Sequence, residues 1–154
     1  MASARPDLAV KSSGSGIWRD REGLRWADPG KKEVTDYNID IAVEAARNGF
    51  DEIQFDYVRF PDAVGLTFCV PNDEENRVRA ISQFFEEARK RLAPYNVFLA
   101  ADIFGYVCWN PNDTCVGQKL ETLAPLVDYI WPMLYPSGFR FGIPGYRIRH
   151  PPVA

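Results

Sequence analysis

Apolar positions follow two different periods along the chain. Helical spacing of apolar residues alternates with short runs of β-forming residues, and polar loops separate them. The predicted strands are 7–11, 51–59, 96–104 and 127–135. The predicted helices are 33–48, 73–93 and about 117–125. The apolar face of the first helix is predicted to consist of Val34, Tyr37, Ile41 and Ala45. The segment after residue 135 is rich in proline and glycine and is predicted to be irregular.

This alternation predicts parallel strands joined by crossover helices. The spacing fits either a doubly wound sheet or part of a (β/α)8 barrel. No glycine-rich phosphate loop follows any strand, which disfavours the nucleotide-binding form. A complete barrel needs about 250 residues, whereas the chain has 154. We therefore predict a single α/β domain, residues 1–154, that forms a partial (β/α)8 TIM barrel with about four parallel strands.

Composition and charge restrict the class of partner. The net charge is −3 and no basic run predicts nucleic-acid binding. No apolar run approaches the roughly 20 residues that span a bilayer, so no membrane segment is predicted in this chain. The first ten residues lack the apolar core of a signal peptide. We expect an extracytoplasmic or cell-envelope location for a parent protein whose leader lies upstream.

The cysteines and the histidine form no metal-binding pattern. Cys69, Cys108 and Cys115 lack the CxxC spacing, and His150 is the only histidine. A local disulfide between Cys108 and Cys115 and free thiols are both compatible with the sequence. We predict no metal site and no cofactor.

Carboxylates stand late in two of the predicted strands. The stretch GFDEIQFDYVRFPD, residues 49–62, places Asp56 among apolar and aromatic residues, and Asp102 lies near the end of 96–104. Side-chain alternation puts Gln54 and Asp56 on one face. Neighbouring parallel strands are about 4.8 Å apart. If the two strands are neighbours, both carboxylates project from the C-terminal edge of the sheet, where α/β proteins bind ligands.

Two neighbouring carboxylates can divide the acid and base roles of glycoside hydrolysis, because each raises the pKa of the other. We therefore predict that Asp56 and Asp102 are catalytic. A strand-end aspartate can instead cap a loop or pair with an arginine such as Arg59. Two aspartates in register, with Gln54 beneath one of them, favour the catalytic interpretation.

Aromatic residues concentrate in the loops that follow the predicted strands. Flat rings suit stacking on sugar faces, although loop aromatics also cover cores. Trp131 is predicted to fill the barrel interior, and Trp18, Trp26 and Tyr106 remain candidates for either role. The predicted substrate-binding residues are Gln54, Arg59, Trp109, Tyr135 and Lys11.

Three runs of the sequence resemble a bacterial family of putative glycoside hydrolase domains. They are DYNIDIAVEAARNGFDEIQFDYVRFP, AADIFGYV and GQKLETLAPLVDYIWPMLYPS, within about residues 8–145. The resemblance implies a (β/α)8 barrel, with Asp56, Arg59, Asp102 and Tyr135 at strand ends. Gly138 stands where the family often has a histidine. The family barrel extends beyond this segment at both ends, so the resemblance implies an internal part of the barrel.

The predicted function is therefore hydrolysis of a polysaccharide by carboxylate acid/base catalysis. The alternative is a carbohydrate-binding barrel domain without catalysis, which Gly138 favours. Metal-dependent hydrolysis with Asp56 and Asp102 as ligands is disfavoured because no histidine accompanies them. Half a barrel exposes strand edges and apolar side chains, so the remaining barrel half or self-association is expected to cover them.

Overall fold

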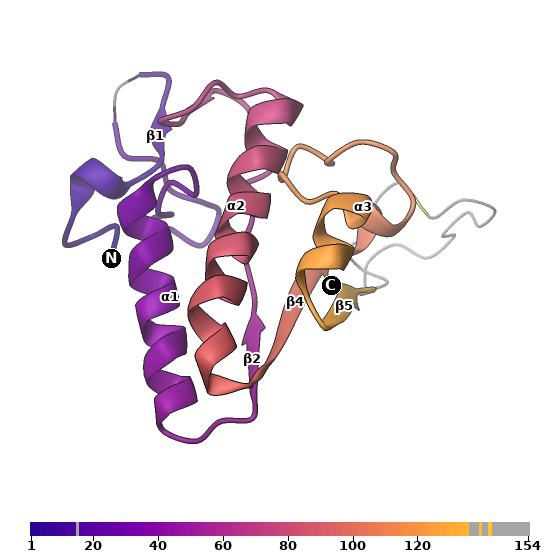
Figure 1. Ribbon diagram of the computed structural model, residues 1–154. Helices are drawn as coiled ribbons and strands as arrows, with labels where there is room; N and C mark the ends of the chain where they lie inside the picture. The colour runs from indigo at the N-terminus through magenta and orange to yellow at the C-terminus, as the bar shows by residue number, and fades with distance from the viewer. Residues whose placement is uncertain (15, 136–138, 140–141, 143–154) are drawn as a thin grey trace.

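A parallel sheet with helices forms the centre of the molecule (Figure 1). The computed structural model describes residues 1–14, 16–135, 139 and 142. The strands of the parallel sheet, in spatial order, are β2 (Glu52–Phe55), β4 (Phe98–Phe104) and β5 (Tyr129–Met133). The predicted mixed α/β fold is confirmed. The described strands do not close into a barrel, and the sheet contains three strands rather than four.

Two long helices, α1 (Lys32–Arg47) and α2 (Glu74–Leu92), lie side by side over one face of this sheet (Figure 1). The short helix α3 (Leu120–Leu123) continues into the 3-10 turn η4 (Ala124–Leu126) before β5. It is shorter than the predicted helix 117–125. No helix within the described ranges combines the length and the hydropathy needed to cross a membrane.

Helix α1 confirms the predicted boundaries within one residue, but its buried face differs from the predicted one. Gly49 follows the helix with φ of +90°, a conformation that glycine adopts without strain. Tyr37 and Ile41 are about half exposed. The residues that α1 buries are Val34, Ile39, Ala42, Val43 and Ala46. The buried face contains Ala42 and Ala46 in place of the larger Tyr37 and Ile41, because small side chains allow α1 to pack closely against α2 and β2.

Helix α2 begins one residue after Asp73, whose carboxylate accepts a hydrogen bond from the backbone amide of Asn76 at 2.8 Å. The residue before Asp73, Asn72, accepts a hydrogen bond from Arg77 at 2.8 Å. The C-terminal end of α2 passes into the 3-10 turn η2 (Ala93–Tyr95), in which Pro94 prevents further α-helix.

The core lies between the helices and the sheet. The ring of Phe55 lies 4.9 Å from Phe84 and 6.0 Å from Phe85, both edge to face. Leu99 and Ile103 of β4 point to the same side and are at most 2% exposed. Each such fully buried side chain contributes about 1.5–3 kcal/mol.

The opposite face of the sheet is open in the part of the chain that the structure describes. Its apolar side chains Phe98, Tyr129 and Trp131 are 52%, 43% and 52% exposed. Gln54 lies opposite Ala100, and Asp102 opposite Trp131, so this face carries polar and aromatic groups together.

The predicted strand 7–11 is wrong as a member of the parallel sheet. Its first residues form the 3-10 turn η1 (Pro6–Leu8), and Lys11 belongs to the two-residue strand β1 (Lys11–Ser12). This strand pairs antiparallel with β3 (Leu66–Thr67). The backbone of this segment forms hydrogen bonds with the adjoining loop instead of β2. The amide of Val10, for example, donates to the carbonyl of Trp26 at 2.9 Å.

The three cysteines are free thiols, so Cys108 and Cys115 are not joined. Burial raises the pKa of the Cys108 thiol and, to about 11, that of Cys69. The predicted irregular segment after Tyr135 lies outside the described residues, apart from positions 139 and 142.

Candidate functional site

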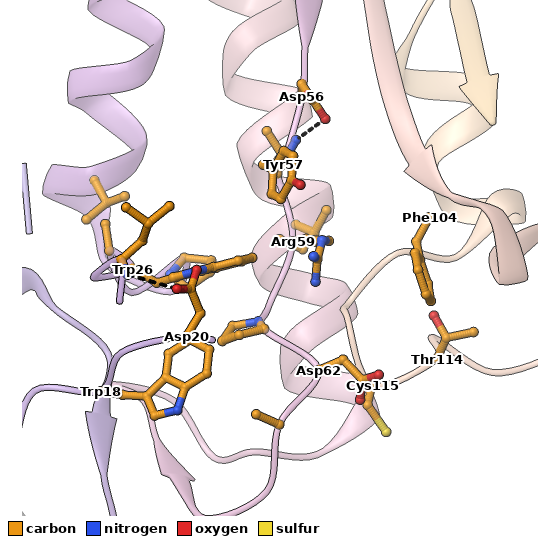
Figure 2. Close-up of a pocket in the computed structure, with 18 of the residues that line it drawn as sticks. Trp18, Asp20, Trp26, Asp56, Tyr57, Arg59, Asp62, Phe104, Thr114 and Cys115 are labelled. Carbon is orange, nitrogen blue, oxygen red and sulfur yellow. Dashed lines mark hydrogen bonds between the residues drawn. The ribbon is translucent and has the colours of Figure 1, made fainter. Parts of the chain in front are cut away.

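A broad open cleft of about 1720 Å³ lies beyond the carboxyl ends of β2 and β4. Its walls come from three loops that are distant in sequence: residues 18–29, 55–64 and 104–115 (Figure 2). Because β2 and β4 are parallel neighbours, the loops that follow them emerge at the same edge of the sheet. This is the edge at which α/β folds bind ligands.

The first wall begins where β2 ends. Asp56 is exposed and follows the last strand residue, Phe55. Tyr57 then adopts φ of +57°, and the Asp56 carboxylate accepts a hydrogen bond from its backbone amide at 2.7 Å. A left-handed tyrosine costs on the order of 1–3 kcal/mol and occurs mainly at functional sites. The turn ends the predicted strand 51–59 early and brings the Tyr57 ring to the cleft.

Aromatic rings from two of the loops form a second wall of the cleft (Figure 2). The ring centres of Trp18 and Trp26 are 6.1 Å apart, and those of Trp26 and Tyr57 are 5.9 Å apart. Asp20 accepts a hydrogen bond from the Trp26 indole at 2.9 Å, and this bond holds the pKa of the Asp20 carboxyl below its usual value. Trp18, Trp26 and Tyr57 are called the aromatic wall below.

Arg59 stands between the aromatic wall and Phe104 (Figure 2). Its guanidinium carbon lies 4.9 Å from the ring centre of Trp26, 5.2 Å from Tyr57 and 5.8 Å from Phe104. Burial lowers the pKa of Arg59, while Tyr57, Asp62 and Asp56 oppose this effect from a distance. One Nη atom donates to the Phe60 carbonyl at 3.2 Å, and the buried Nε has no hydrogen-bond partner.

Asp102 occupies the open face of the sheet. It is partly buried in β4, and its Oδ1 accepts a hydrogen bond from Gln54 Nε2 at 2.5 Å. The last paired residues of the two strands are Phe55 and Ala101, so Asp56 and Asp102 follow at the same level of neighbouring strands. Asp56 lines the cleft, whereas Asp102 and Gln54 lie beside it on the open face.

Gln118 links the ends of both strands, a role that no sequence pattern indicates. It is 1% exposed. Its Nε2 donates to the carbonyl of Val58 at 3.1 Å and to that of Asp102 at 3.3 Å, and its Oε1 accepts from the amide of Phe104 at 2.7 Å. Gln118 thereby positions the backbone on which both aspartates stand.

A buried ion pair holds the third loop of the cleft. Arg77 of α2 donates to both oxygens of Asp113, at 2.7 and 2.9 Å. Burial raises the pKa of Asp113, but the hydrogen bond and charge of Arg77, with the amides of Cys115 and Gly117, outweigh it and lower the pKa overall. This pair was also missed, because 36 residues separate its members.

Asp62 is a further exposed carboxylate on the cleft wall that sequence reasoning missed. It lies in the loop between β2 and β3, where strand periodicity gives no information. Three carboxylates that line the cleft, Glu22, Asp56 and Asp62, form no ion pair and no hydrogen bond to a side chain within the described ranges.

The remaining predicted substrate-binding residues lie away from the cleft. Lys11 stands opposite Thr67 in the small antiparallel sheet. Trp109 follows the 3-10 turn η3 (Gly105–Cys108) and packs edge to face on Phe139 at 5.3 Å. Tyr135 lies just beyond β5 and is 64% exposed. None of the three is among the residues that line the cleft, and Gly138 falls outside the described residues.

No group of three or more histidine, cysteine, aspartate or glutamate side chains is arranged to hold a metal ion in the residues that the structure describes. The lining of the cleft supplies carboxylates, aromatic rings and the guanidinium groups of Arg19, Arg21, Arg25 and Arg59.

Comparison with known proteins places this geometry in a family. A crystal structure of a hypothetical protein from Ruminiclostridium thermocellum ATCC 27405 is 44% identical in sequence, with a TM-score of 0.58 over 66% of this chain and 50% of that chain. The chain thus spans about half the length of that protein's chain. A search of curated proteins gave no match. A family model described as "Putative glycosyl hydrolase domain" matches residues 1–152. The chain belongs to this family of putative glycosyl hydrolase domains.

Proposed function

We propose that the protein hydrolyses a polysaccharide by carboxylate acid/base catalysis in the cleft at the carboxyl ends of β2 and β4. The observation that carries the proposal is the exposed carboxylate of Asp56 at the end of a parallel strand, in the same cleft as the aromatic wall. Such an arrangement offers a proton donor beside a surface on which a sugar ring can stack.

Asp56 is the proposed general acid that protonates the glycosidic oxygen. Asp102, at the same level on the neighbouring strand, is the proposed base or nucleophile. Neighbouring strands are about 4.8 Å apart, and glycosidases hold their two carboxyl groups roughly 5 to 9.5 Å apart. The Nε2 of Gln54 donates to Oδ1 of Asp102 at 2.5 Å and so orients this carboxylate. Gln54 is thus a positioning residue in this proposal.

The proposed architecture around this site is a (β/α)8 barrel of which the chain supplies part. Two observations support it: helices cover only one face of the parallel sheet, and the solved relative is about twice as long as the matched part. In a barrel the open face becomes the interior, which buries Phe98, Tyr129 and Trp131. The remaining barrel half, or a second copy of the chain, would cover this face.

A carbohydrate-binding domain without catalysis is the second candidate. It is favoured by the position of Asp102 outside the cleft lining, because the aromatic wall could then hold a glycan without a complete acid/base pair. A parent protein that binds oligosaccharides and releases no product from them would select this candidate.

The test is a screen of the full-length protein against bacterial and plant polysaccharides, with release of reducing ends as the readout. Asp56→Asn is expected to lower turnover at least about 100-fold, the usual contribution of a general acid. Its melting temperature should stay nearly unchanged, because Asp56 is exposed.

Asp51→Asn is the matched control for this experiment. Asp51 is equally exposed but precedes β2, at the opposite end of the same strand. The control should retain both activity and stability. Full activity of Asp56→Asn would disprove the catalytic role, and unfolding of this variant alone would show that Asp56 is structural.

A further inference from the structure

The charge of Arg59 is not neutralised inside the protein. No carboxylate lies within 4.0 Å of its guanidinium in the described part of the chain. Arg77 shows how the same chain treats a structural arginine: both of its terminal hydrogen-bonding edges are occupied, by Asp113 and Asn72. Arg59 instead has one long bond to a carbonyl and a buried Nε without a partner.

This unpaired cation stands at the cleft rather than on the outer surface. Arg59 lines the cleft, and three aromatic rings surround its guanidinium. The rings remove water from the group without supplying a hydrogen-bond acceptor. A partly desolvated guanidinium with free donors binds carboxylate or sulfate strongly, because its planar fork matches two oxygens of the anion.

The nearby carboxylates do not replace such an anion. Asp62 and Asp56 act on Arg59 only through longer-range attraction, and neither forms an ion pair with it. Asp56 and Asp62 are both exposed, and solvent therefore weakens their charges.

We propose that the cleft takes an acidic glycan, with the carboxylate of a uronic acid or a sulfate ester of the sugar bound by the guanidinium of Arg59. This inference rests on the proposed function in one respect, namely that the cleft binds a glycan. The sugar ring stacks on the aromatic wall, and the anionic group reaches the free donors of Arg59.

The experiment measures binding of matched ligand pairs to the full-length protein by calorimetry. One pair is a trigalacturonate and its methyl ester, in which neutral ester groups replace the carboxylates. The other is a sulfated oligosaccharide and its desulfated form. The wild-type protein should bind the charged member of one pair about tenfold or more tightly than the neutral member, as expected for a charge-assisted hydrogen bond. The pair that shows the difference identifies the anion.

Two substitutions test whether Arg59 causes this preference. Arg59→Gln should abolish the difference between the two ligands, and Arg59→Lys should retain part of it, because lysine keeps the charge but lacks the planar fork. The matched control is Arg47→Gln, which removes an arginine that also lies over a ring, that of Tyr95, far from the cleft. The control should bind like the wild type.

Equal binding of charged and neutral ligands in both pairs would overturn the inference, as would the absence of binding or a preference that survives in Arg59→Gln. If Arg59→Gln fails to fold, the inference is still tested by the charge preference of the wild-type protein and by its partial loss in Arg59→Lys. Hydrolysis of neutral polysaccharides without a preference for acidic ones would support the proposed function and overturn the inference about Arg59. Acidic preference without hydrolysis would support the inference and remove the catalytic proposal.

Discussion

Two loops at the same edge of the sheet place their main polar groups differently. Loop 110–118 directs Asp113 and Gln118 inward: Asp113 pairs with Arg77, and Gln118 bonds to the ends of β2 and β4. Loop 56–62 directs Asp56 and Asp62 outward to the cleft and leaves Arg59 without an ion pair in the described residues. Asp113 and Gln118 hold the two loops and strand ends in place, whereas Asp56, Arg59 and Asp62 belong to the proposed binding site.

The difference shows how to distinguish structural from functional polar residues. Satisfied, buried groups far apart in sequence hold the frame, since an unpaired buried charge costs several kcal/mol. The exposed carboxylates of Asp56 and Asp62, and Arg59 with its unpartnered Nε, are the groups that the proposed function uses. Substitutions in the two loops should therefore have separable effects on stability and on binding.

The largest expected effect on stability comes from Arg77→Met. The change leaves the buried carboxylate of Asp113 without its counter-ion, and Asp113 is only 3% exposed at its side chain. Breaking a buried pair in this way costs about 3–5 kcal/mol. Urea unfolding of the variant measures the loss.

Arg79→Met is the control for that substitution, because Arg79 lies on the same helix in an exposed pair with Glu75. Such pairs contribute about 0–1 kcal/mol. An equal loss in both variants would contradict the assigned role of Arg77. A second substitution, Asp113→Leu, should recover part of the loss in Arg77→Met by removing the orphaned charge.

Gln118→Met is expected to have the next largest effect. Methionine has a similar length but leaves the amide of Phe104 and the carbonyls of Val58 and Asp102 without their partner. Unsatisfied buried groups of this kind cost about 1–3 kcal/mol in total stability. Glycan affinity or turnover should fall as well, because these strand ends carry the cleft. Gln83→Met, an exposed change on α2, should alter neither property.

The smallest expected effect is on the acid sensitivity of the protein. The folded-state pKa of Asp113 is lowered from its ordinary 3.8, so its contribution is present above that value and is lost as the pH falls through the lowered pKa. Wild-type protein should therefore lose more unfolding free energy on acidification than Asp113→Asn. Asp7, Asp20, Asp73 and Asp128 also have lowered pKa values, which makes the difference small. Identical pH dependence in the two proteins would show that Asp113 contributes nothing through its charge.

The strand–helix alternation was predictable because it depends on local periodicity. The boundaries of α1 and α2 and the parallel arrangement of β2, β4 and β5 agree with the sequence. The fate of 7–11 was not predictable, because a short apolar run has the same local preference whether it joins the main sheet or a neighbouring loop. Tertiary packing decides that Val10 of this segment forms its backbone hydrogen bond with Trp26.

For the site, strand parity placed Gln54 on the same face as Asp102, and the hydrogen bond between them follows from that register. The alternation of side chains does not continue through Tyr57, because the backbone leaves the strand there with a positive φ. The predictions for Lys11, Trp109 and Tyr135 rested on their positions at strand or loop ends, and such positions do not specify which cavity a side chain meets.

The amino-acid sequence by itself determined the order of elements, the parallel sheet and the presence of carboxylates at strand ends, since each follows from short-range spacing. The tertiary structure alone decided which loops meet: it brought Trp26, Arg59 and Phe104 together from three separate segments. It also decided that Arg77 has a carboxylate partner and that Arg59 has none among the described residues. The physical reason is that pairing and desolvation depend on distances in space, and residues 36 or more positions apart in the chain carry no local signal of them.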